Sequence, residues 1–375
     1  MIKSLLVKVI LFAVIIIILP ASSISAETTE TTSDGFEYFL LLGKAIITAY
    51  KGSDLSPIVP DSIEGAPVTR IADWAVAMKP FSHSLTMITL PSTLISIGEH
   101  AFSGCSSLAN INLPNGLLSI GKGAFQDCSS LTSVHIPSAI TVIAEATFLR
   151  CTGLSEVVLS EGIISIGPVA FDGCSSLRQI TLPSSLRDFG QQAFAGSALT
   201  NITIPSSVND LSSYTFQGCS ALEYVKLPDS LNSINVGTFE GCDSLNNVII
   251  PDGVTDIGFK AFGYCPSLIR ITIPESVNQI DESAFTNRNP AMVVYGHKGS
   301  SAEAYCTIYG IGFIVVKNPG DATNDGSVDI LDLVAIIDYI VSGTAPKSPE
   351  NANANGEGGI DILDLVWVID KIVGG

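Results

Sequence analysis

The chain has 375 residues, enough for two or three domains, and carries a formal net charge of −18. A surface this acidic should repel nucleic acid and anionic lipid, so neither is expected as a partner. Hydrophobic residues make up 46% of the composition and charged residues only 14%. The acids gather near the C-terminus: residues 320–375 hold ten Asp and Glu against two Lys, a density that calls for a bound cation.

The first 26 residues have the composition of a secretory signal peptide. Lys3 and Lys8 precede an apolar run over residues 9–19, and small residues follow at 21–26. This run is too short for a membrane span, which needs about 20 residues. We therefore expect residues 1–26 to be removed from a secreted protein, with an uncleaved anchor as the alternative. No membrane span is expected in the rest of the chain.

Most of the chain consists of copies of one 23-residue unit. Residues 84–106 read SLTMITLPSTLISIGEHAFSGCS, and residues 107–129 read SLANINLPNGLLSIGKGAFQDCS. The shared frame is L-x-x-I-x-L-P-x-x-L-x-x-I-G-x-x-A-F-x-x-C, with nine clear units and a weaker one near 57–79. Because one unit cannot bury its own apolar edge, we expect the units to stack as about ten coils of a solenoid.

Each unit should contribute two inward-facing edges and one buried phenylalanine. In the first clear unit, Leu85 and Ile88 fall on a short strand that Pro91 ends, since proline lacks the N–H of a strand ladder. Gly98 allows the turn after the second edge. Stacking should align like residues into ladders. The phenylalanine ladder comprises Phe102, Phe125, Phe148, Phe171, Phe194, Phe216, Phe239, Phe262 and Phe285.

This frame resembles the bacterial surface-antigen type of leucine-rich repeat called BspA-like. Residues 36–67 are similar to the N-terminal cap of that family, and 295–316 to its C-terminal cap, with a short helix near 301–309. The resemblance implies an α/β leucine-rich-repeat solenoid with parallel strand ladders, used on bacterial surfaces and in secreted proteins for adhesion or protein binding. The predicted domains are a signal peptide (1–26), an N-terminal linker and cap (27–57), the repeats (58–289), a C-terminal cap (290–317) and a last module (318–375).

Seven of the eight cysteines occupy the same place in their units. They are Cys105, Cys128, Cys151, Cys174, Cys219, Cys242 and Cys265, and Ser197 fills this place in one unit. Cysteines on neighbouring coils would lie within disulfide range, but with parallel Cβ vectors that fit a disulfide poorly. We expect a ladder of small buried thiols, with disulfides as the alternative.

No catalytic constellation stands out. The four histidines (His83, His100, His135 and His297) fall at unrelated positions of the frame. There is no nucleophile elbow, phosphate loop or Cys/His metal spacing. His297 and Cys306 are the one conceivable catalytic Cys/His pair. A surface histidine and a buried cysteine, neither of them catalytic, explain these two residues better. The protein is therefore expected not to be an enzyme.

The outward positions of the first strands vary from unit to unit and form the candidate ligand face of the solenoid. Most hold Ser, Thr or Asn, so a merely solvated sheet explains them equally well. The best candidates for ligand contacts are Arg178, Glu223, Tyr224, Lys226 and Arg270, because Tyr and Arg are favoured at binding hot spots. The expected ligand is an unknown protein or polymer.

Two copies of an acidic pattern follow the break at Pro319-Gly320. Residues 321–332 read DATNDGSVDILD, and residues 353–364 read NANGEGGIDILD. Oxygen ligands at alternating positions, a central glycine and a final carboxylate match a calcium loop of the EF-hand type. Each copy continues into an apolar helix, whereas prolines preclude a helix before it. A solvated acidic tail, the alternative, does not explain this spacing, so two loop–helix units that bind two Ca²⁺ are expected.

The paired units resemble a type I dockerin, a small all-α module that binds cohesin domains of scaffold proteins, as in the polysaccharide-degrading cellulosome. The resemblance assigns as calcium ligands Asp321, Thr323, Asp325, Ser327 (backbone), Asp329 and Asp332 in the first loop, and Asn353, Asn355, Glu357, Gly359 (backbone), Asp361 and Asp364 in the second. It places the cohesin contacts at Ile330, Leu331, Ile362 and Leu363. Many dockerins have hydroxyl residues at these four positions.

The leading hypothesis is a secreted, non-catalytic binding protein. Its solenoid would recognise a protein or a surface, and its dockerin would attach it to a scaffold protein when calcium is bound. A second hypothesis is a surface adhesin or structural spacer whose calcium module only stabilises the solenoid. A third is an enzyme or a protease inhibitor.

Overall fold

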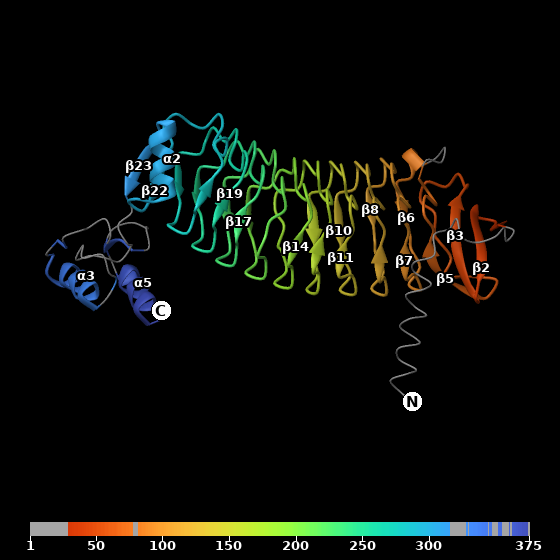
Figure 1. The fold of residues 1–375 in the computed structure, drawn as a ribbon. Coiled ribbons are helices and arrows are strands. Elements are labelled where there is room, and N and C mark those ends of the chain that lie inside the picture. Colours follow the sequence, from red (N-terminus) through yellow and green to blue (C-terminus); the bar gives the residue numbers. More distant parts are fainter. Residues whose placement is uncertain are drawn as a thin grey trace. The chain divides into compact units, whose positions relative to one another are not determined.

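The computed structural model describes residues 29–77, 82–315, 328, 330–343, 345–346, 352–354, 360 and 362–373 (Figure 1). The predicted signal peptide at 1–26 lies outside these residues. The chain divides into two compact units. The first comprises Met1–Ile269 with Gln279–Asn289, and the second comprises Arg270–Asn278 with Pro290–Gly375.

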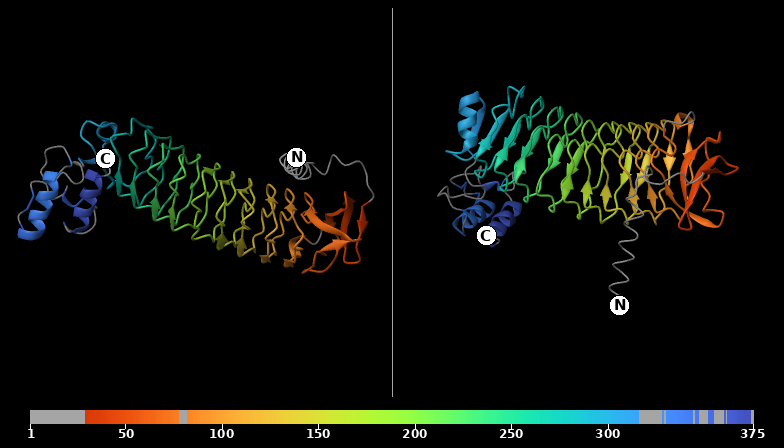
Figure 2. Two further views of the ribbon diagram at one scale, coloured as in Figure 1. Left: turned by 90° about the horizontal axis from the view of Figure 1, so that it is seen from below. Right: turned by 45° about the vertical axis from the view of Figure 1, so that its right-hand side comes forward.

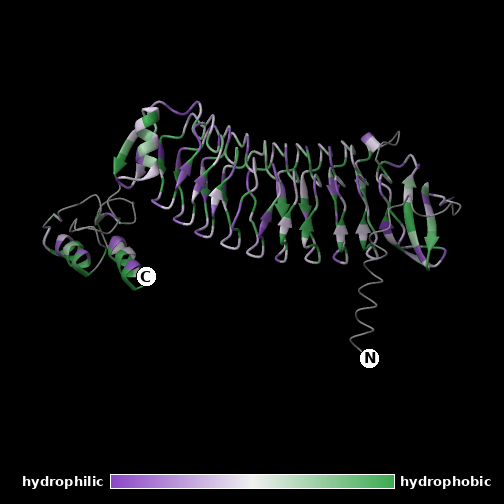
Figure 3. Cartoon of the chain, viewed as in Figure 1, coloured by the Kyte–Doolittle hydropathy of each residue, from purple (hydrophilic) through white to green (hydrophobic). Residues whose placement is uncertain are grey.

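An antiparallel hairpin opens the first unit and leads into a parallel ladder. β2 (Phe36–Leu41) and β3 (Lys44–Tyr50) form the hairpin, which is largely apolar (Figure 3), and β1 (Glu30–Thr31) pairs with β2. β3 then runs parallel to β5 (Ala66–Ile71), which also pairs with the short antiparallel strand β4 (Ser62–Ile63) and, in parallel, with the next strand of the ladder. Because the parallel ladder already begins at β3, the solenoid has about 12 turns rather than about ten.

Stacked turns give two ladders of short parallel strands (Figure 2). After a single-turn 3₁₀ helix (Ser82–Ser84), the first ladder contains β6 (Met87–Ile88), β8 (Asn110–Ile111), β10 (Ser133–His135), β12 (Glu156–Val158), β15 (Asn201–Thr203), β16 (Tyr224–Lys226) and β18 (Asn247–Ile249). The second contains β7 (Ser96–Ile97), β9 (Ser119–Ile120), β11 (Val142–Ile143), β13 (Ser165–Ile166), β14 (Asp188–Phe189), β17 (Ser233–Ile234), β19 (Asp256–Ile257) and β21 (Gln279–Ile280). Paired residues such as Ser133 and Glu156 lie one repeat apart in the sequence, so the repeat period sets the register.

The core of the first unit is a stack of nine phenylalanine rings, one from each clear repeat. All nine side chains are at most 2% exposed. Neighbouring rings of the stack are parallel to within 13°, with centroids 5.3–5.8 Å apart. Each aromatic pair adds about 0.5–1.5 kcal/mol to the free energy that burial supplies. The predicted phenylalanine ladder is confirmed, and so is the inward placement of Leu85 and Ile88, each 2% exposed.

The glycine after the second edge is needed for close packing between turns. A Cβ on Gly98 would lie 2.6 Å from the backbone of Ala72 and Asp73, and a Cβ on Gly121 would lie 2.6 Å from Gly98. Neither glycine has a positive φ. The turn that the sequence assigns to Gly98 is therefore a position where one backbone approaches the next, rather than a left-handed bend.

Two positions in most turns adopt a left-handed backbone, and glycine does not always fill them. One lies just before the Ala-Phe pair of the frame, and the other just before the cysteine. The non-glycine residues at these positions have φ between 48° and 62°: His100, Asp127, Ala146, Arg150, Val169, Gln192, Tyr214, Lys260, Tyr264 and Asn287. Each such residue costs about 1–2 kcal/mol of conformational energy. The packed ladder holds them in place.

Val169→Gly should stabilise the solenoid. Val169 is a β-branched residue at φ 48°, so glycine removes the left-handed strain, while its greater freedom in the unfolded chain offsets part of the gain. We expect the free energy of unfolding, measured by urea denaturation, to rise by about 1 kcal/mol. The reverse change at the equivalent position, Gly123→Val, should lower it by more than about 2 kcal/mol, because the new Cβ would overlap the His100 ring. Equal effects of the two variants would contradict this explanation.

Both ladders are interrupted where one repeat is a residue short. The leucines that open successive units are separated by a full repeat except at Leu177 and Leu199, where one residue is missing. No strand forms at 178–181 in the first ladder or at 207–212 in the second, although the structure describes both segments. Phe189 stands in an isoleucine position of the frame here, and its ring lies 6.1 Å from that of Phe194 and 6.3 Å from that of Phe216. Phe189 is only 5% exposed, so the larger side chain packs in the interior at the irregular turn.

The second unit contains the end of the repeats and the C-terminal helices. β20 (Arg270–Thr272), β22 (Val293–Gly296) and β23 (Gly312–Val315) pair in parallel. α2 (Ser301–Tyr309) connects the last two strands and confirms the short helix predicted near 301–309. Ser300 caps its N-terminus by accepting a hydrogen bond from the Glu303 N–H, and Gly310 ends it in the left-handed conformation. α3 (Ile330–Ser342) and α5 (Ile362–Val373) follow.

Candidate functional site

Helices α3 and α5 enclose a small apolar core. Ile336 and Val368, one from each helix, are fully buried. The remaining members are Ala352 and Ala354, with Val328, Leu333, Ala335, Ile360, Leu365 and Trp367 packed against them. A core this small supplies little stability, and modules of this size usually depend on disulfides or bound metal. The fold of this segment therefore calls for an additional stabilising element.

Each helix carries a buried carboxylate in its first turn. Asp332 is the third residue of α3, Asp364 is the third residue of α5, and both are 0% exposed. Burying an ionised carboxylate costs several kcal/mol unless it is paired or ligates a cation. Carboxylate oxygens are also the hard donors that Ca²⁺ prefers. The burial and the donor chemistry of both side chains fit the calcium-ligand role predicted for the last loop position.

Asn353, also a predicted ligand, lies in the described residues and is partly buried. The other nine fall outside the described residues: Asp321, Thr323, Asp325, Ser327, Asp329, Asn355, Glu357, Gly359 and Asp361. Within the described ranges, no group of three or more His, Cys, Asp or Glu side chains is arranged to hold a metal ion. Most ligands of both predicted loops lie beyond those ranges, so the loops stay predictions.

An apolar stripe runs along the exposed side of α3. Two predicted cohesin contacts lie on it, Ile330 at 67% exposed and Leu331 at 56%. Val334, Ile337 and Val341 continue the stripe at helical spacing and are exposed as well. On α5 the equivalent exposed residues are Val366, Ile369 and Val373. Ile362 and Leu363 begin this helix, but their side chains are not among those that the structure describes. An apolar surface of this extent on a small module marks an interaction site.

The predicted ligand face of the solenoid is only partly brought together. Tyr224 and Lys226 point outward from β16 with Val225 buried between them, and Glu223 is exposed just before the strand. Arg178 is exposed two turns earlier, in the segment where the first ladder has no strand. Arg270 belongs to β20 of the second unit.

Arg270 already has a partner within its own unit. Its guanidinium lies 4.8 Å from the centroid of the Tyr295 ring, and its Nη2 donates a hydrogen bond to the Tyr295 hydroxyl at 3.1 Å. These contacts give Arg270 a role in the structure of the second unit.

Two further residues of this face, Ile249 and Ile269, were not among the predicted ones. Both are more than half exposed, although isoleucine is usually buried. The available signal was their place in the frame: they occupy outward positions where most other units have a polar residue.

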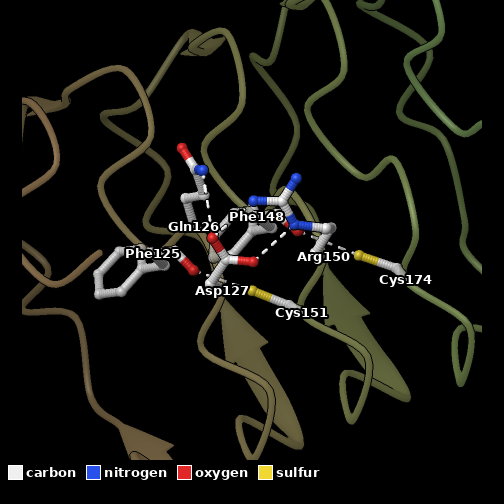
Figure 4. A network of polar contacts seen from close by, with 7 residues as sticks. All are labelled: Phe125, Gln126, Asp127, Phe148, Arg150, Cys151 and Cys174. Atoms are coloured by element: carbon white, nitrogen blue, oxygen red, sulfur yellow. Dashed lines mark hydrogen bonds and ion pairs between the residues drawn. The ribbon is translucent and has the colours of Figure 1, made fainter. Parts of the chain in front are cut away.

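The repeat cysteines form a ladder of buried, free thiols. The Cys151 Sγ donates to the Phe125 carbonyl at 3.0 Å, and the Cys174 Sγ donates to the Phe148 carbonyl at 3.3 Å (Figure 4). Cys128, Cys219, Cys242 and Cys265 repeat this contact with the phenylalanine of the preceding turn. The expected thiol ladder is confirmed. Each thiol is a second donor to its phenylalanine carbonyl, which also accepts the backbone N–H of the cysteine or serine in its own turn.

Beside this ladder, Asp127 and Arg150 form a bidentate ion pair across two turns (Figure 4). The Nε and Nη2 atoms of Arg150 donate to the two oxygens of Asp127 at 2.6 and 2.7 Å. The hydrogen bonds from Arg150 hold the pKa of the Asp127 carboxyl below its usual value. Both residues occupy left-handed positions, so the pair offsets some of the backbone strain there.

Alkaline pH should destabilise the solenoid through these thiols. Burial raises the pKa of Cys105, Cys151, Cys219 and Cys265 to about 12 from an ordinary 9.0. The unfolded chain ionises first, so the stabilisation is complete below pH 9 and is lost as the pH rises from 9 towards 12. We expect the free energy of unfolding to fall by about 1.4 kcal/mol per thiol for each pH unit in this window, measured by urea denaturation.

Serine variants separate this effect from the ionisation of lysine and tyrosine. Ser197 shows that a hydroxyl fits the position: it is buried, and its Oγ lies 3.3 Å from the Cys219 Sγ. A chain with serine at 105, 151, 219 and 265 should lose less stability between pH 9 and 11. An identical loss in both chains would show that the thiols do not control it.

None of the helices in the described residues is both long and apolar enough to cross a membrane.

Comparisons with known proteins agree with this architecture. The BspA type leucine rich repeat region matches in six copies over residues 79–200 and 188–306, and the dockerin type I domain matches residues 319–373. None of the curated proteins matches the chain.

Among solved structures, the chain is similar to a leucine rich cell surface protein from Faecalibacterium prausnitzii A2-165, with 25% identity over 75% of this chain and 97% of that one, at a TM-score of 0.40. It is also similar to a leucine rich repeat protein of T. pallidum, with 27% identity over 64% of this chain and 90% of that one, at a TM-score of 0.37. Leucine-rich repeats and dockerins are non-catalytic kinds of domain, and a dockerin implies a cohesin partner. Because the repeat family covers more than half of the sequence, the chain belongs to the BspA-type leucine-rich repeat proteins, and it carries a type I dockerin domain at its C-terminal end.

Proposed function

We propose that this chain is a secreted, non-catalytic binding protein that attaches to a scaffold protein through a calcium-dependent contact between its dockerin and a cohesin. The solenoid is its recognition element, and the assembly is extracellular, as in a cellulosome. The oxygen ligands of the two loops, from Asp321 to Asp332 and from Asn353 to Asp364, hold one Ca²⁺ each.

The observation that carries the proposal is the position of Asp332 next to Leu331 on α3. Asp332 is fully buried, as a calcium ligand at the end of a loop should be, whereas Leu331 is 56% exposed. One helical turn therefore links the predicted metal site to the predicted docking surface. Calcium that organises the loop also fixes the backbone that presents the apolar stripe.

A set of purified cohesins tests the proposal. The full-length chain is immobilised and exposed to each cohesin in calcium and in EDTA. At least one cohesin should be captured in calcium and released by EDTA. Since both helices begin with the same ILDLV segment, Leu331 and Leu363 are changed together to Asp, and we expect the affinity to fall at least about thirtyfold.

Matched exposed residues of the solenoid provide the control. Leu118 and Ile164 are 49% and 43% exposed, and their replacement by Asp should leave cohesin capture unchanged. Capture that persists in EDTA would argue against the calcium requirement. Capture of no cohesin would favour a spacer or an adhesin whose C-terminal module only stabilises the solenoid.

A further inference from the structure

The short turn that leads from the first ladder into the second has the same geometry in most repeats. A proline opens it, and the N–H of the aliphatic residue three positions later donates to the proline carbonyl, as Leu117 does to Pro114 at 3.0 Å. In this repeat the two residues between them are Asn115 and Gly116, and both are exposed. The other repeats have Ser, Asp or Glu in place of Asn115: Ser92, Ser138, Glu161, Ser184, Ser206, Asp229, Asp252 and Glu275.

An asparagine that precedes glycine can react with its own backbone. The Gly116 nitrogen loses its proton and attacks the Cγ atom of Asn115, and the amide nitrogen leaves as ammonia, so a five-membered succinimide ring forms. Glycine has no Cβ to hinder this approach. Water then opens the ring. Addition of water at Cγ gives aspartate, whereas addition at the backbone carbonyl carbon gives isoaspartate, in which the chain continues through the former side chain. Asparagine is for such reasons a thermolabile residue.

The structure leaves this reaction open at Asn115. In the described part of the chain, no hydrogen bond involves the Gly116 N–H, the Asn115 carbonyl or the Asn115 side chain. A Cβ built on Gly116 would find its nearest neighbours, the carbonyl oxygens of Ser92 and Leu94, at 3.7 and 3.9 Å. The backbone is therefore not pressed against the preceding turn, and the bond between Leu117 and Pro114 alone opposes the rotation that brings the Gly116 nitrogen to Cγ.

Two similar pairs in the repeats are held more tightly. Gly253 follows Asp252 in an equivalent turn, but a Cβ on Gly253 would lie 2.7 Å from the Asp229 carbonyl oxygen, so this backbone packs against the turn before it. Asn232 precedes Ser233 of β17, and its carbonyl accepts a hydrogen bond from the Thr255 N–H at 2.9 Å. Rotation of the Asn232 carbonyl would break that bond, so attack by the Ser233 nitrogen requires local opening of the ladder.

We propose that Asn115 is a site of spontaneous modification, at which the folded protein reacts with water alone to give aspartate and isoaspartate. The inference is independent of the proposed binding function. The solenoid tolerates the aspartate product, because Asp229 and Asp252 fill the same place in other repeats. The isoaspartate product lengthens the backbone by one atom beside Leu117, which is fully buried, and should weaken the stacking of this turn on its neighbours.

Peptide mapping by mass spectrometry tests the inference on the full-length chain. The chain is incubated at neutral pH, both folded and in guanidinium chloride, and loss of the asparagine amide is measured peptide by peptide. Isoaspartate is quantified with protein isoaspartyl methyltransferase and labelled S-adenosylmethionine. Asn115→Ser, which copies the other repeats, should abolish the reaction in its peptide, and Gly116→Ala should slow it about tenfold. Asn355-Gly356, outside the described residues, falls in a different peptide and is scored separately.

In the folded chain Asn115 should react at least about tenfold faster than Asn232, and no more than about tenfold slower than in guanidinium chloride. Protection of Asn115 beyond that factor, or equal rates at Asn115 and Asn232, would overturn the inference. An unchanged rate in Gly116→Ala would overturn the attack by the backbone nitrogen. Chains enriched in isoaspartate should unfold at a lower urea concentration than fresh chains, whereas Asn115→Asp should match them. Equal midpoints for all three would refute the proposed effect on stacking.

Discussion

Phe171→Ala is expected to lower the free energy of unfolding of the solenoid by about 3–5 kcal/mol. The Phe171 ring is fully buried and stacks between Phe148 and Phe194, with centroid distances of 5.4 and 5.3 Å. Its removal leaves a cavity and breaks two aromatic contacts at once. Because each turn contacts only its neighbours, the loss should also reduce the cooperativity between the two halves of the solenoid. Urea denaturation followed by far-UV circular dichroism measures both effects.

Phe259 provides the matched control. It is a phenylalanine of the same solenoid but is 46% exposed and lies outside the stack. Phe259→Ala should change the free energy of unfolding by about 1 kcal/mol or less. If the two variants lose similar stability, the phenylalanine stack is not the principal source of stability in the repeats.

Calcium removal is expected to unfold the C-terminal module while the solenoid remains folded. Two helices with few fully buried residues supply little stability, whereas calcium at a thousand times its Kd adds about 4 kcal/mol. Trp367 packs against the apolar core and reports on the transition. The chain has two tryptophans, so a Trp74→Phe background isolates the Trp367 signal. In EDTA its emission should shift to the red, and the helical signal should fall.

Alanine variants of acidic residues in α3 and α5 distinguish the loss of a metal ligand from the mere loss of a negative charge. Asp332→Ala with Asp364→Ala should reproduce the unfolded state even in calcium, because both carboxylates are buried where the loops meet the helices. Asp338→Ala removes an exposed acid of α3 and should leave the calcium response unchanged. A Trp367 spectrum that is the same in calcium and in EDTA would contradict the proposed role of the metal.

The architecture of the solenoid could be predicted because its determinants are local and periodic. One repeated frame assigns Phe102 and its eight equivalents to a single ladder, and the structure confirms that ladder. The missing strands at 178–181 and 207–212 could not be predicted, because a one-residue deletion can be absorbed at several places in a turn. The packing of the Phe189 ring against Phe194 and Phe216 at this turn depends on three-dimensional contacts.

Left-handed backbone positions show another limit of the sequence. At Gly104 and Gly173 the residue type suggests the conformation, but Arg150 and Val169 adopt it without such a signal. Stacking against neighbouring turns imposes the conformation on these residues, and no local propensity reveals it.

The candidate site was predictable to a different degree in each domain. In the dockerin, the loop pattern and the family resemblance predicted Asp332 and Asp364 as ligands. Both are buried in the first turn of a helix, and their role as calcium ligands stays a prediction. On the solenoid, residue type favoured Arg270, which instead contacts Tyr295 within its own unit. Exposure, which a linear pattern shows only indirectly, was needed to find Ile249 and Ile269.

Calorimetric titration of the full-length chain with a captured cohesin tests the central claim most directly. The titration is run in calcium, then in EDTA, and again after calcium has been restored. A saturable heat of binding should appear in calcium, vanish in EDTA and return with calcium. Equal binding in all three conditions would contradict the account, because docking would then need no metal-organised surface.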